Sequence, residues 1–293
     1  MGVATAMLRR FCRRAPEHEF VAVILAAGSG SRLGSGVKCL VEVGGRSLLE
    51  HQFRALEEAG VNTVVVVAGH QVERVRRAVG GRADVIVNDR YAETNSVYSF
   101  MLARESVDGS ALVLNADVLF HPEVIRRLLD VDGSALAFDS SADLDDETMK
   151  VEVYDEHLVR MSKTLEPVVQ SGENLGILKL DGSAALAAFA LVTLAEEIAS
   201  GRLRLEAGAQ PDDVIAQLVA LPGIGRWTAQ YIAMRALRWP DAFPKEDVAL
   251  RKNLGGVTAA RAEELSEAWR PWRSYATLHL WQRMVGEGQA RVK

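Results

Sequence analysis

The apolar and polar positions of this chain follow one pattern up to about residue 180 and another after it. In the first part, short continuous apolar runs alternate with stretches in which apolar residues recur every three or four positions. Continuous runs are typical of buried strands in parallel sheets, and the longer period is typical of amphipathic helices. The pattern predicts strands at residues 20–28, 61–69, 83–88, 111–117 and 134–139, and helices at 46–59, 71–79, 96–105 and 122–129.

This alternation predicts an α/β fold with a mainly parallel sheet that helices cover on both faces. Residues 149–163 and 175–180 alternate between polar and apolar positions, so we predict them as added antiparallel strands. Beyond Asp181 no strand pattern follows, residues 184–199 predict one helix, and the rest predicts helices joined by short turns. The predicted organisation is a flexible lead-in at 1–19, an α/β domain at 20–190 and an all-α segment at 191–293.

Composition favours two units of different origin. Residues 1–190 hold 20 Lys and Arg against 27 Asp and Glu, the rest hold 14 against 12, and all five tryptophans lie in the last 70 residues.

Cys12 and Cys39 have no disulfide or metal spacing, so we expect a reducing cytoplasm. No apolar run approaches the roughly 20 residues of a membrane helix, so we expect no membrane contact. The basic start lacks the apolar core of a targeting signal, which favours a lead-in over a signal.

The sequence LAAGSGSRLG, residues 25–34, directly follows the first predicted strand. Gly28 and Gly30 can adopt backbone angles closed to other residues, so their N–H groups can converge on phosphate oxygens. Arg32 and Lys38 add positive charge for a triphosphate. The spacing is not the GxxxxGK(S/T) of a P-loop, and the third glycine is misplaced for a dinucleotide-binding motif.

Together with VKCLVEVGGRSLLEHQ (37–52), NDRYAETNSVYS (88–99), LVLNAD (112–117) and SGENLGILKL (171–180), this loop resembles the sugar-phosphate nucleotidyltransferases. The phosphocholine cytidylyltransferase-like branch fits best, although Val37 stands where many relatives have proline. The resemblance implies a Rossmann-like fold, Mg²⁺, and transfer of a nucleotidyl group from a nucleoside triphosphate, with CTP favoured, to a small phosphorylated acceptor. The nucleotide-binding residues that it implies are Ala27, Gly28, Ser29, Gly30, Ser31, Arg32 and Lys38, with Arg32 and Lys38 also catalytic.

The same resemblance makes Asp117 a Mg²⁺ ligand at the carboxyl edge of the sheet. The alternative is an Asx turn or a helix cap ahead of His121 and Pro122. Lys150, as a catalytic residue, and Lys163 would face the acceptor or the α-phosphate, and the alternative for both is a solvated strand face.

Acceptor binding is assigned to Asn95, Tyr98, Lys163 and Glu173. In choline-type relatives, aromatic rings and carboxylates surround a quaternary ammonium, so Tyr91, Tyr98, Tyr154 and Glu173 are candidates for such a site. Phe100 is a further aromatic candidate, for which we favour the core.

One expected feature is missing from the sequence. The superfamily usually carries a second metal-binding aspartate on a later strand, and no such strand is predicted after Leu180. Asp212 and Asp213 are poor substitutes because they fall where a helix N-terminus is predicted. The metal site is therefore expected to be half complete.

The tail contains LPGIGRWTAQYIAMRALRWPDAFPKEDVALRK (221–252) and RAEELSEAWRPWRSYATLHLWQRM (261–284). These segments resemble the helix-hairpin-helix motif and the following part of bacterial DNA-3-methyladenine glycosylase II. The resemblance makes Asp247 the catalytic carboxylate of a base-excising enzyme. Without the resemblance, Asp247 would cap a helix and the aromatic residues would be core. The implied DNA- and base-binding residues are Gly223, Gly225, Trp227, Tyr231 and Trp281.

Three hypotheses of function follow. The first is a Mg²⁺-dependent nucleotidyltransferase, and the second is a DNA glycosylase that excises alkylated bases. In the third, one or both activities are lost and the tail binds DNA or packs. In the glycosylase family that the tail resembles, the catalytic cleft lies between two helical lobes, and here the α/β domain replaces the residues upstream of the hairpin that would supply the first lobe. This missing lobe and the missing second aspartate both fall near residue 190, which motivates the third hypothesis.

Overall fold

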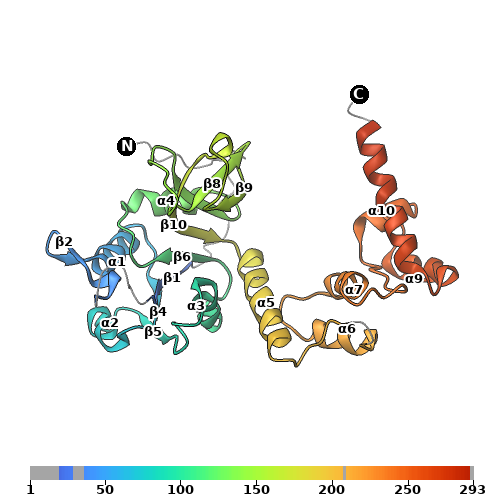
Figure 1. Cartoon of the computed structure of the whole chain (residues 1–293), viewed down its shortest axis with the longest axis horizontal. Coiled ribbons are helices and arrows are strands. Elements are labelled where there is room, and N and C mark those ends of the chain that lie inside the picture. Colours follow the sequence, from blue (N-terminus) through green and yellow to red (C-terminus); the bar gives the residue numbers. More distant parts are fainter. Residues whose placement is uncertain (1–19, 29–35, 207–208, 291–293) are drawn as a thin grey trace. The chain divides into compact units, whose positions relative to one another are not determined.

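The computed structural model of this chain describes residues 20–28, 36–206 and 209–290. The chain forms two compact units, Met1–Ala188 and Phe189–Lys293 (Figure 1). We call them the first and the second unit.

A mixed sheet is the centre of the first unit. Its described strands are β1 (Val21–Ala26), β4 (Thr63–Ala68), β5 (Asp84–Val87), β6 (Ala111–Asn115), β7 (Ala135–Asp139), β8 (Lys150–Tyr154), β9 (His157–Ser162) and β10 (Gly172–Leu180). They are arranged as β5-β4-β1-β6-β10-β8-β9, and β7 pairs with β10. A small hairpin, β2 (Glu42–Val43) with β3 (Arg46–Ser47), stands apart.

The strand directions follow from the pairing. β1 pairs in parallel with β4 and β6, and β4 pairs in parallel with β5. β10 is antiparallel to β6, β7 and β8, so it lies between β6 and β7 and these two run the same way. The predicted α/β fold, a mainly parallel sheet with added antiparallel strands, is confirmed.

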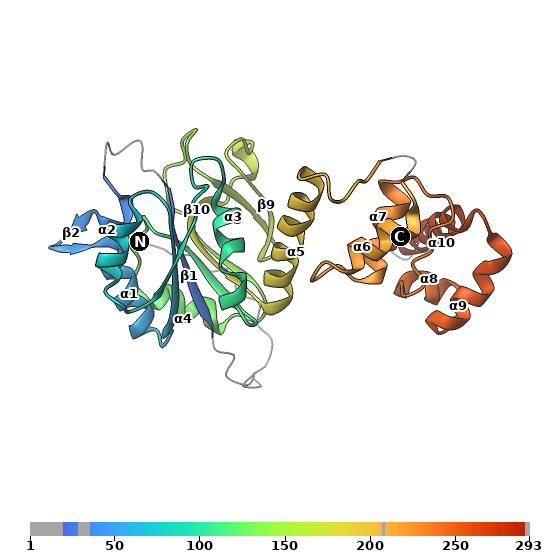
Figure 2. The same ribbon diagram turned by 90° about the horizontal axis from the view of Figure 1, so that it is seen from below.

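Helices cover both faces of this sheet, as predicted. They are α1 (Leu48–Glu58), α2 (Val72–Val79), α3 (Ser96–Leu102) and α4 (Pro122–Asp130). One apolar cluster joins Ile24 of β1 and Leu114 of β6 to Leu56 of α1 and Ile125 of α4, and it includes α2 as well. α3 packs against β1 and β4 and buries Phe100. In Figure 2 α3 and the other three helices lie on opposite sides of the sheet.

The second unit is helical in its described residues, as predicted. Its helices are α6 (Pro211–Val219), α7 (Arg226–Arg235), α8 (Val248–Asn253), α9 (Ala259–Ser266) and α10 (Arg273–Ala290). An apolar cluster with Leu203, Val214, Leu218 and Ala233 joins α6 to α7. A smaller one contains Phe243, Leu250 and Ala262.

Helix α5 (Gly182–Ala199) spans the boundary of the two units. It has 18 residues, a mean hydropathy of 1.5 and few buried positions, so by length and composition it is apolar enough to cross a membrane. The expectation that no apolar run approaches this length was therefore wrong. The reason is that its charged residues, Glu196 and Glu197, both lie in its last turn. A single such helix does not establish a membrane span.

Candidate active sites

A cavity of about 470 Å³ lies at the carboxyl ends of β1 and β6 in the first unit. Its wall comes from four segments: the end of β1, the η2 turn (Lys38–Leu40), the turn before α3 and the end of β6. Open α/β sheets bind their ligands at this edge. The lining residues include Ala27, Gly28, Lys38, Asn95, Asn115 and Asp117.

Strand register explains why these segments meet. Leu25 of β1 pairs with Asn115 of β6, and the Ala116 N–H continues the ladder by donating to the Leu25 carbonyl at 3.3 Å. Because the two strands are parallel and in register, Ala27 and Asp117 leave the sheet at the same edge. The remaining predicted loop residues, Ser29, Gly30, Ser31 and Arg32, lie outside the described residues.

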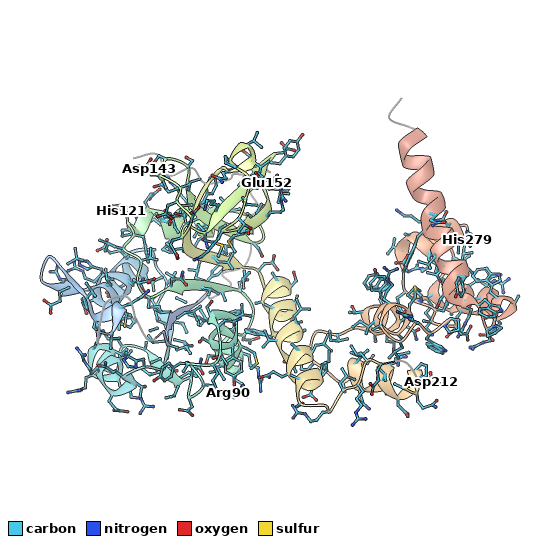
Figure 3. All side chains as sticks on the ribbon, in the orientation of Figure 1. Arg90, His121, Asp143, Glu152, Asp212 and His279 are labelled. Atoms are coloured by element: carbon cyan, nitrogen blue, oxygen red, sulfur yellow. The ribbon has the colours of Figure 1, made fainter. Side chains whose placement is uncertain are left out.

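Lys38 and Asp117 meet across this cavity. The Lys38 Nζ lies 3.2 Å from the Asp117 Oδ2, and about two fifths of each side chain is exposed. The alternative role of Asp117 as the cap of α4 is taken by another residue, because His121 (Figure 3) accepts the Glu123 N–H at its Nδ1. The carboxylate of Asp117 is therefore left facing the cavity with a lysine beside it.

The turn between β5 and α3 is shaped by a buried asparagine. Asn88 donates to the hydroxyls of Thr94 and Ser99 at 3.1 and 3.0 Å, and its Oδ1 accepts the Arg90 N–H at 2.9 Å. These bonds fold residues 88–99 so that Asn95, the N-cap of α3, reaches the cavity.

Tyr91 also lines the cavity, and a close approach at Gly69 makes room for it. A Cβ at position 69 would lie 2.6 Å from the Tyr91 Cβ and 2.9 Å from the Ala27 carbonyl oxygen. Glycine is therefore required where the end of β4 meets the tyrosine. The sequence predicts Tyr91 as an aromatic candidate, whereas it does not indicate a role for Gly69 or Asn115.

Cys39 lines the cavity with an uncharged side chain. Burial raises the pKa of its thiol to about 11, so the thiol is protonated at neutral pH. The cavity therefore gains no thiolate negative charge beside Asp117.

The remaining predicted residues of the first unit do not line this cavity. The buried Lys150 ammonium donates to the carbonyls of Asp145, Thr148 and Lys163, which occupy it in place of a phosphate. The sequence does not reveal these contacts, because the turn that supplies the Asp145 and Thr148 carbonyls leaves no trace in strand periodicity.

Three further predicted residues, Lys163, Tyr98 and Glu173, do not line the cavity. Lys163 pairs with Glu147 at 3.0 Å. The Arg90 guanidinium lies over the Tyr98 ring, 5.4 Å from its centroid. Glu173 is half-buried on β10, opposite Lys150 of β8. Of the acceptor candidates, Asn95 and Tyr91 line the cavity, whereas Tyr98, Lys163 and Glu173 do not. Phe100 is core, as expected, and Tyr154 is 77% exposed.

In the second unit the predicted carboxylate is surrounded by N–H donors. Asp247 is the N-cap of α8, and its Oδ1 accepts the Leu250 N–H at 2.6 Å and the Trp281 indole N–H at 3.1 Å. Its Oδ2 accepts the Trp227 indole N–H at 2.7 Å. The helix-cap alternative therefore holds, and the same carboxylate also binds both predicted tryptophans.

The aromatic residues form a continuous group beside Asp247. Trp227 and Tyr231 stack with ring centroids 5.4 Å apart and planes at 4°, and Tyr231 lies 6.1 Å from Trp281. Trp227 is 40% exposed, so this group is not closed core. The structure thus brings Asp247 together with the three aromatic residues that the resemblance assigned to base binding.

The predicted hairpin lies between α6 and α7. Gly223 has φ +86, which favours glycine, whereas Gly225 is the N-cap of α7 at φ −82 with open space around a would-be Cβ. Only Gly223 therefore needs to be glycine for conformational reasons. Asp212 and Asp213 lie in the first turn of α6, at the helix N-terminus where they were predicted (Figure 3).

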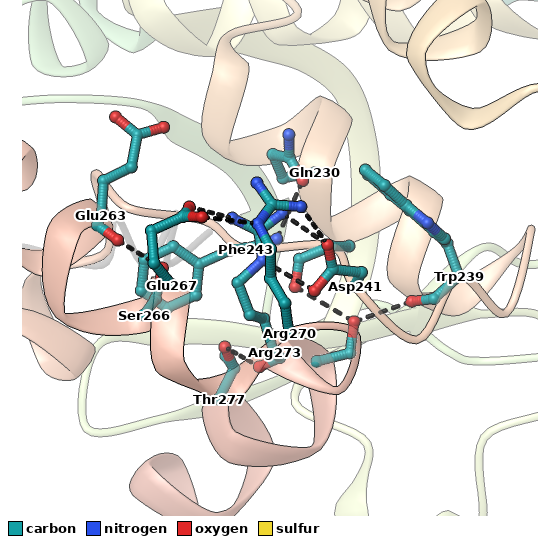
Figure 4. Close-up of polar contacts among 12 residues, drawn as sticks. Gln230, Trp239, Asp241, Phe243, Glu263, Ser266, Glu267, Arg270, Arg273 and Thr277 are labelled. Atoms are coloured by element: carbon teal, nitrogen blue, oxygen red, sulfur yellow. Dashed lines mark hydrogen bonds and ion pairs between the residues drawn. The ribbon is translucent and has the colours of Figure 1, made fainter.

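A buried ionic network holds the segment that leads to Asp247 (Figure 4). Arg273 donates to both oxygens of Asp241 at 2.8 Å, and both side chains are less than 10% exposed. Arg270 adds a bond to Asp241, and the Ser274 hydroxyl donates to the carbonyls of Trp239 and Ala242. The loop between α7 and α8 is thereby fixed to the start of α10.

Comparison with known proteins bears on both units. Residues 22–169 match the MobA-like NTP transferase domain. The chain is 36% identical over 113 residues to choline-phosphate cytidylyltransferase of Streptococcus pneumoniae, covering 36% of this chain and 48% of that protein.

Two further relatives are glycosylase-like. Over 92 residues the chain is 51% identical to a probable bifunctional transcriptional activator/DNA repair enzyme AlkA of Mycobacterium tuberculosis, covering 30% of this chain and 18% of that protein. Over 92 residues it is 38% identical to DNA-3-methyladenine glycosylase 2 of Escherichia coli, covering 31% and 33%. The chain spans less than half of the length of each of these three relatives. The two predicted resemblances are confirmed, and since the domain match extends over half of the chain, the chain belongs to the MobA-like NTP transferase family.

Proposed function

We propose that the first unit moves a nucleotidyl group from a nucleoside triphosphate, with CTP favoured, to a small phosphorylated acceptor such as phosphocholine or a sugar phosphate. One observation carries the proposal: Lys38 and Asp117 face each other at a cavity on the carboxyl edge of the sheet. The preference for CTP and for this acceptor class is supported by the relative named choline-phosphate cytidylyltransferase.

The proposed reaction needs charge neutralisation more than covalent help from the protein. An oxygen of the acceptor phosphate attacks the α-phosphorus, a new P–O bond forms, and the bond to the β-phosphate breaks to release pyrophosphate. Both reactants are anions, so Lys38 would hold phosphate oxygens beside Gly28. Asn95 and Tyr91 also line the cavity and would border the bound molecules.

Asp117 is the carboxylate among the cavity's lining residues that could hold Mg²⁺. The described residues contain no group of three or more His, Cys, Asp or Glu that could hold a metal. Mg²⁺ is commonly held by one or two carboxylates together with substrate phosphates and waters, so Asp117 fits as a single protein ligand. When bound, the ion would offset the charge of the phosphates.

A panel of nucleoside triphosphates tests this proposal. Pyrophosphate release is measured for CTP, UTP, ATP and GTP, each with phosphocholine or a sugar phosphate and Mg²⁺. We expect release with CTP and phosphocholine, its loss in Asp117→Ala, and its retention in the exposed control Asp108→Ala. Absence of release with every pair would reject the proposal.

We further propose a second candidate function, excision of alkylated bases from DNA by the second unit. The specific observation is the Asp247 carboxylate held by two indole N–H groups beside stacked rings. Aromatic rings can stack on a flipped, cationic base, and a carboxylate can stabilise positive charge on the sugar.

Release of 3-methyladenine from alkylated DNA tests the second candidate. We expect release that Asp247→Asn abolishes. DNA binding without base release would favour the third hypothesis, in which the tail binds but does not catalyse.

A further inference from the structure

The loop that carries Asp117 is held by a buried glutamine of α1. Gln52 is 1% exposed and lies among Leu49, Phe53 and Leu56 on the buried face of this helix. Its Nε2 donates to the carbonyl oxygens of Asn115 and Val118, at 2.8 Å each. Because both acceptors are carbonyls, the nitrogen of the carboxamide must be the atom that faces them.

The two carbonyls lie on either side of Asp117 along the chain. Asn115 ends β6 and Val118 follows Asp117, so one NH₂ group closes a short loop that contains Ala116 and Asp117. The backbone on either side of the carboxylate is therefore tied to α1, which itself packs against the sheet and α4. A loop anchored in this way cannot move its backbone away from the cavity without breaking one of these bonds, so the point from which the Asp117 side chain leaves the chain is held at the cavity.

The burial of this amide is not needed for packing. The Gln52 Oε1 is the one buried side-chain oxygen or nitrogen without a hydrogen-bond partner among the residues that the structure describes. An apolar side chain of the same size would fill the site without leaving an oxygen unbonded. The feature that an apolar residue would not supply is the pair of N–H donors to the Asp117 loop.

We infer that Gln52 is a positioning residue that sets the Asp117 carboxylate for a divalent cation carried by the nucleotide. This inference rests on the proposed nucleotidyltransferase function. Gln52 touches neither substrate nor metal, and it acts through the backbone on both sides of Asp117. Residues that orient a metal ligand typically change metal affinity or activity roughly 10- to 100-fold when they are replaced.

Nucleotide binding with and without Mg²⁺ tests the inference on the full chain. The Kd of the tightest of the four nucleoside triphosphates is measured by calorimetry in Mg²⁺ and again in EDTA. For Gln52→Met, which keeps the volume and removes the donors, we expect a Kd in Mg²⁺ roughly 10-fold weaker and an unchanged Kd in EDTA. In the matched control Leu56→Ala we expect a lower Tm and an unchanged effect of Mg²⁺ on the Kd of the nucleotide.

A double-mutant cycle separates positioning from general damage. If Gln52 acts through Asp117, Gln52→Met has no further effect on the Kd in Mg²⁺ once Asp117→Asn is present. The inference would be overturned if Gln52→Met weakened the Kd in Mg²⁺ equally in the wild type and in Asp117→Asn. It would also be overturned if Gln52→Met weakened the Kd equally in Mg²⁺ and in EDTA, or did not weaken it at all. Should Gln52→Met not fold, Gln52→Asn replaces it, because asparagine keeps the amide but is too short to reach both carbonyls. The Kd values in Mg²⁺ and in EDTA, with and without Asp117→Asn, then test the inference in the same way. Failure of the proposed function itself would differ, because the wild type would then bind no nucleotide.

Discussion

The two carboxylates at the centre of the candidate sites have different surroundings. Asp117 in the first unit has Lys38 as its charged partner and keeps 43% of its side chain exposed beside a cavity. Asp247 in the second unit accepts one backbone N–H and two indole N–H groups. The first arrangement leaves carboxylate oxygens available to a ligand, whereas the second uses both oxygens within the protein.

The two sites therefore differ in what a complete active site would require of each unit. The site of the first unit assembles from strand ends that the sheet brings together, and under the proposed function bound nucleotide and metal would complete it. The second unit holds its carboxylate rigidly, yet the chain spans a third or less of the two glycosylase-like relatives reported above. Rigid placement and a complete active site are therefore separate properties, and the following tests address them separately.

Breaking the buried ionic network should have the largest effect. Arg273→Met leaves the buried Asp241 with fewer partners, and we expect a loss of about 3–5 kcal/mol in the stability of the second unit. All five tryptophans lie in this unit, so tryptophan fluorescence during urea unfolding reports it selectively. Arg261→Ala, which breaks an exposed pair with Glu264, is the matched control and should cost less than about 1 kcal/mol. Similar midpoints for the two variants would contradict the role of the network.

The close approach at Gly69 gives a comparable test in the first unit. Gly69→Ala places a Cβ against Tyr91 and the Ala27 carbonyl, and we expect a cost of about 1–3 kcal/mol from overpacking. Far-UV circular dichroism during unfolding measures it. The double variant Gly69→Ala/Tyr91→Gly should recover part of the stability lost in the single variant Gly69→Ala, since it removes the Tyr91 Cβ and Cγ, which would lie 2.6 and 2.8 Å from the added Cβ. An unchanged midpoint for Gly69→Ala would show that the turn before α3 is free to shift.

The indole bonds to Asp247 can be removed one at a time. Trp227→Phe keeps an aromatic ring for stacking on Tyr231 but deletes the N–H that bonds the Asp247 Oδ2. We expect a loss of about 1.5 kcal/mol in the second unit, because the bond has a charged acceptor but is partly exposed. Urea unfolding followed by the remaining tryptophans measures it, and no change would mean that the indole bond adds nothing to the rigidity of the carboxylate.

The smallest effect concerns pH and the start of α5. Bonds from Ser183, then from the Ala184 N–H and the Ser134 hydroxyl, lower the pKa of Asp181 from 3.8 to about 2. Since the folded-state pKa is depressed, this stabilisation is present above about pH 4 and is lost as the pH falls toward 2. Unfolding midpoints between pH 5 and pH 2 should fall less steeply in Asp181→Asn than in the wild type. Parallel curves would contradict this role.

The sequence pattern predicted the elements better than the contacts of single side chains. Apolar runs and helical periods located β1, β4, β6 and the helices of the first unit, because burial of one face determines both patterns. The position of Asp117 at the carboxyl edge of the sheet also follows from the pattern, since the parallel strands β1 and β6 end at one edge.

Other contacts depended on turns that carry no periodic signal. The carbonyls around Lys150 and the clamp of Gln52 come from the backbone of loops, so residue types alone do not reveal them. One signal was present for Gln52, a polar residue on the otherwise apolar face of α1. The indole bonds to Asp247 cross 20 and 34 positions of sequence, and only the folded chain shows that the tryptophans point their N–H groups at the carboxylate.

The most direct test is the Mg²⁺ dependence of nucleotide binding by the full chain. Thermal shift and calorimetry with CTP, UTP, ATP and GTP compare the wild type with Asp117→Asn and Asp247→Asn, because a ligand that binds the native state raises its stability. We expect Mg²⁺ to tighten the binding of CTP in the wild type and in Asp247→Asn, and to have no such effect in Asp117→Asn. Binding of no nucleotide, or an equal effect of Mg²⁺ in all three proteins, would contradict the placement of the nucleotide site at the edge of the sheet.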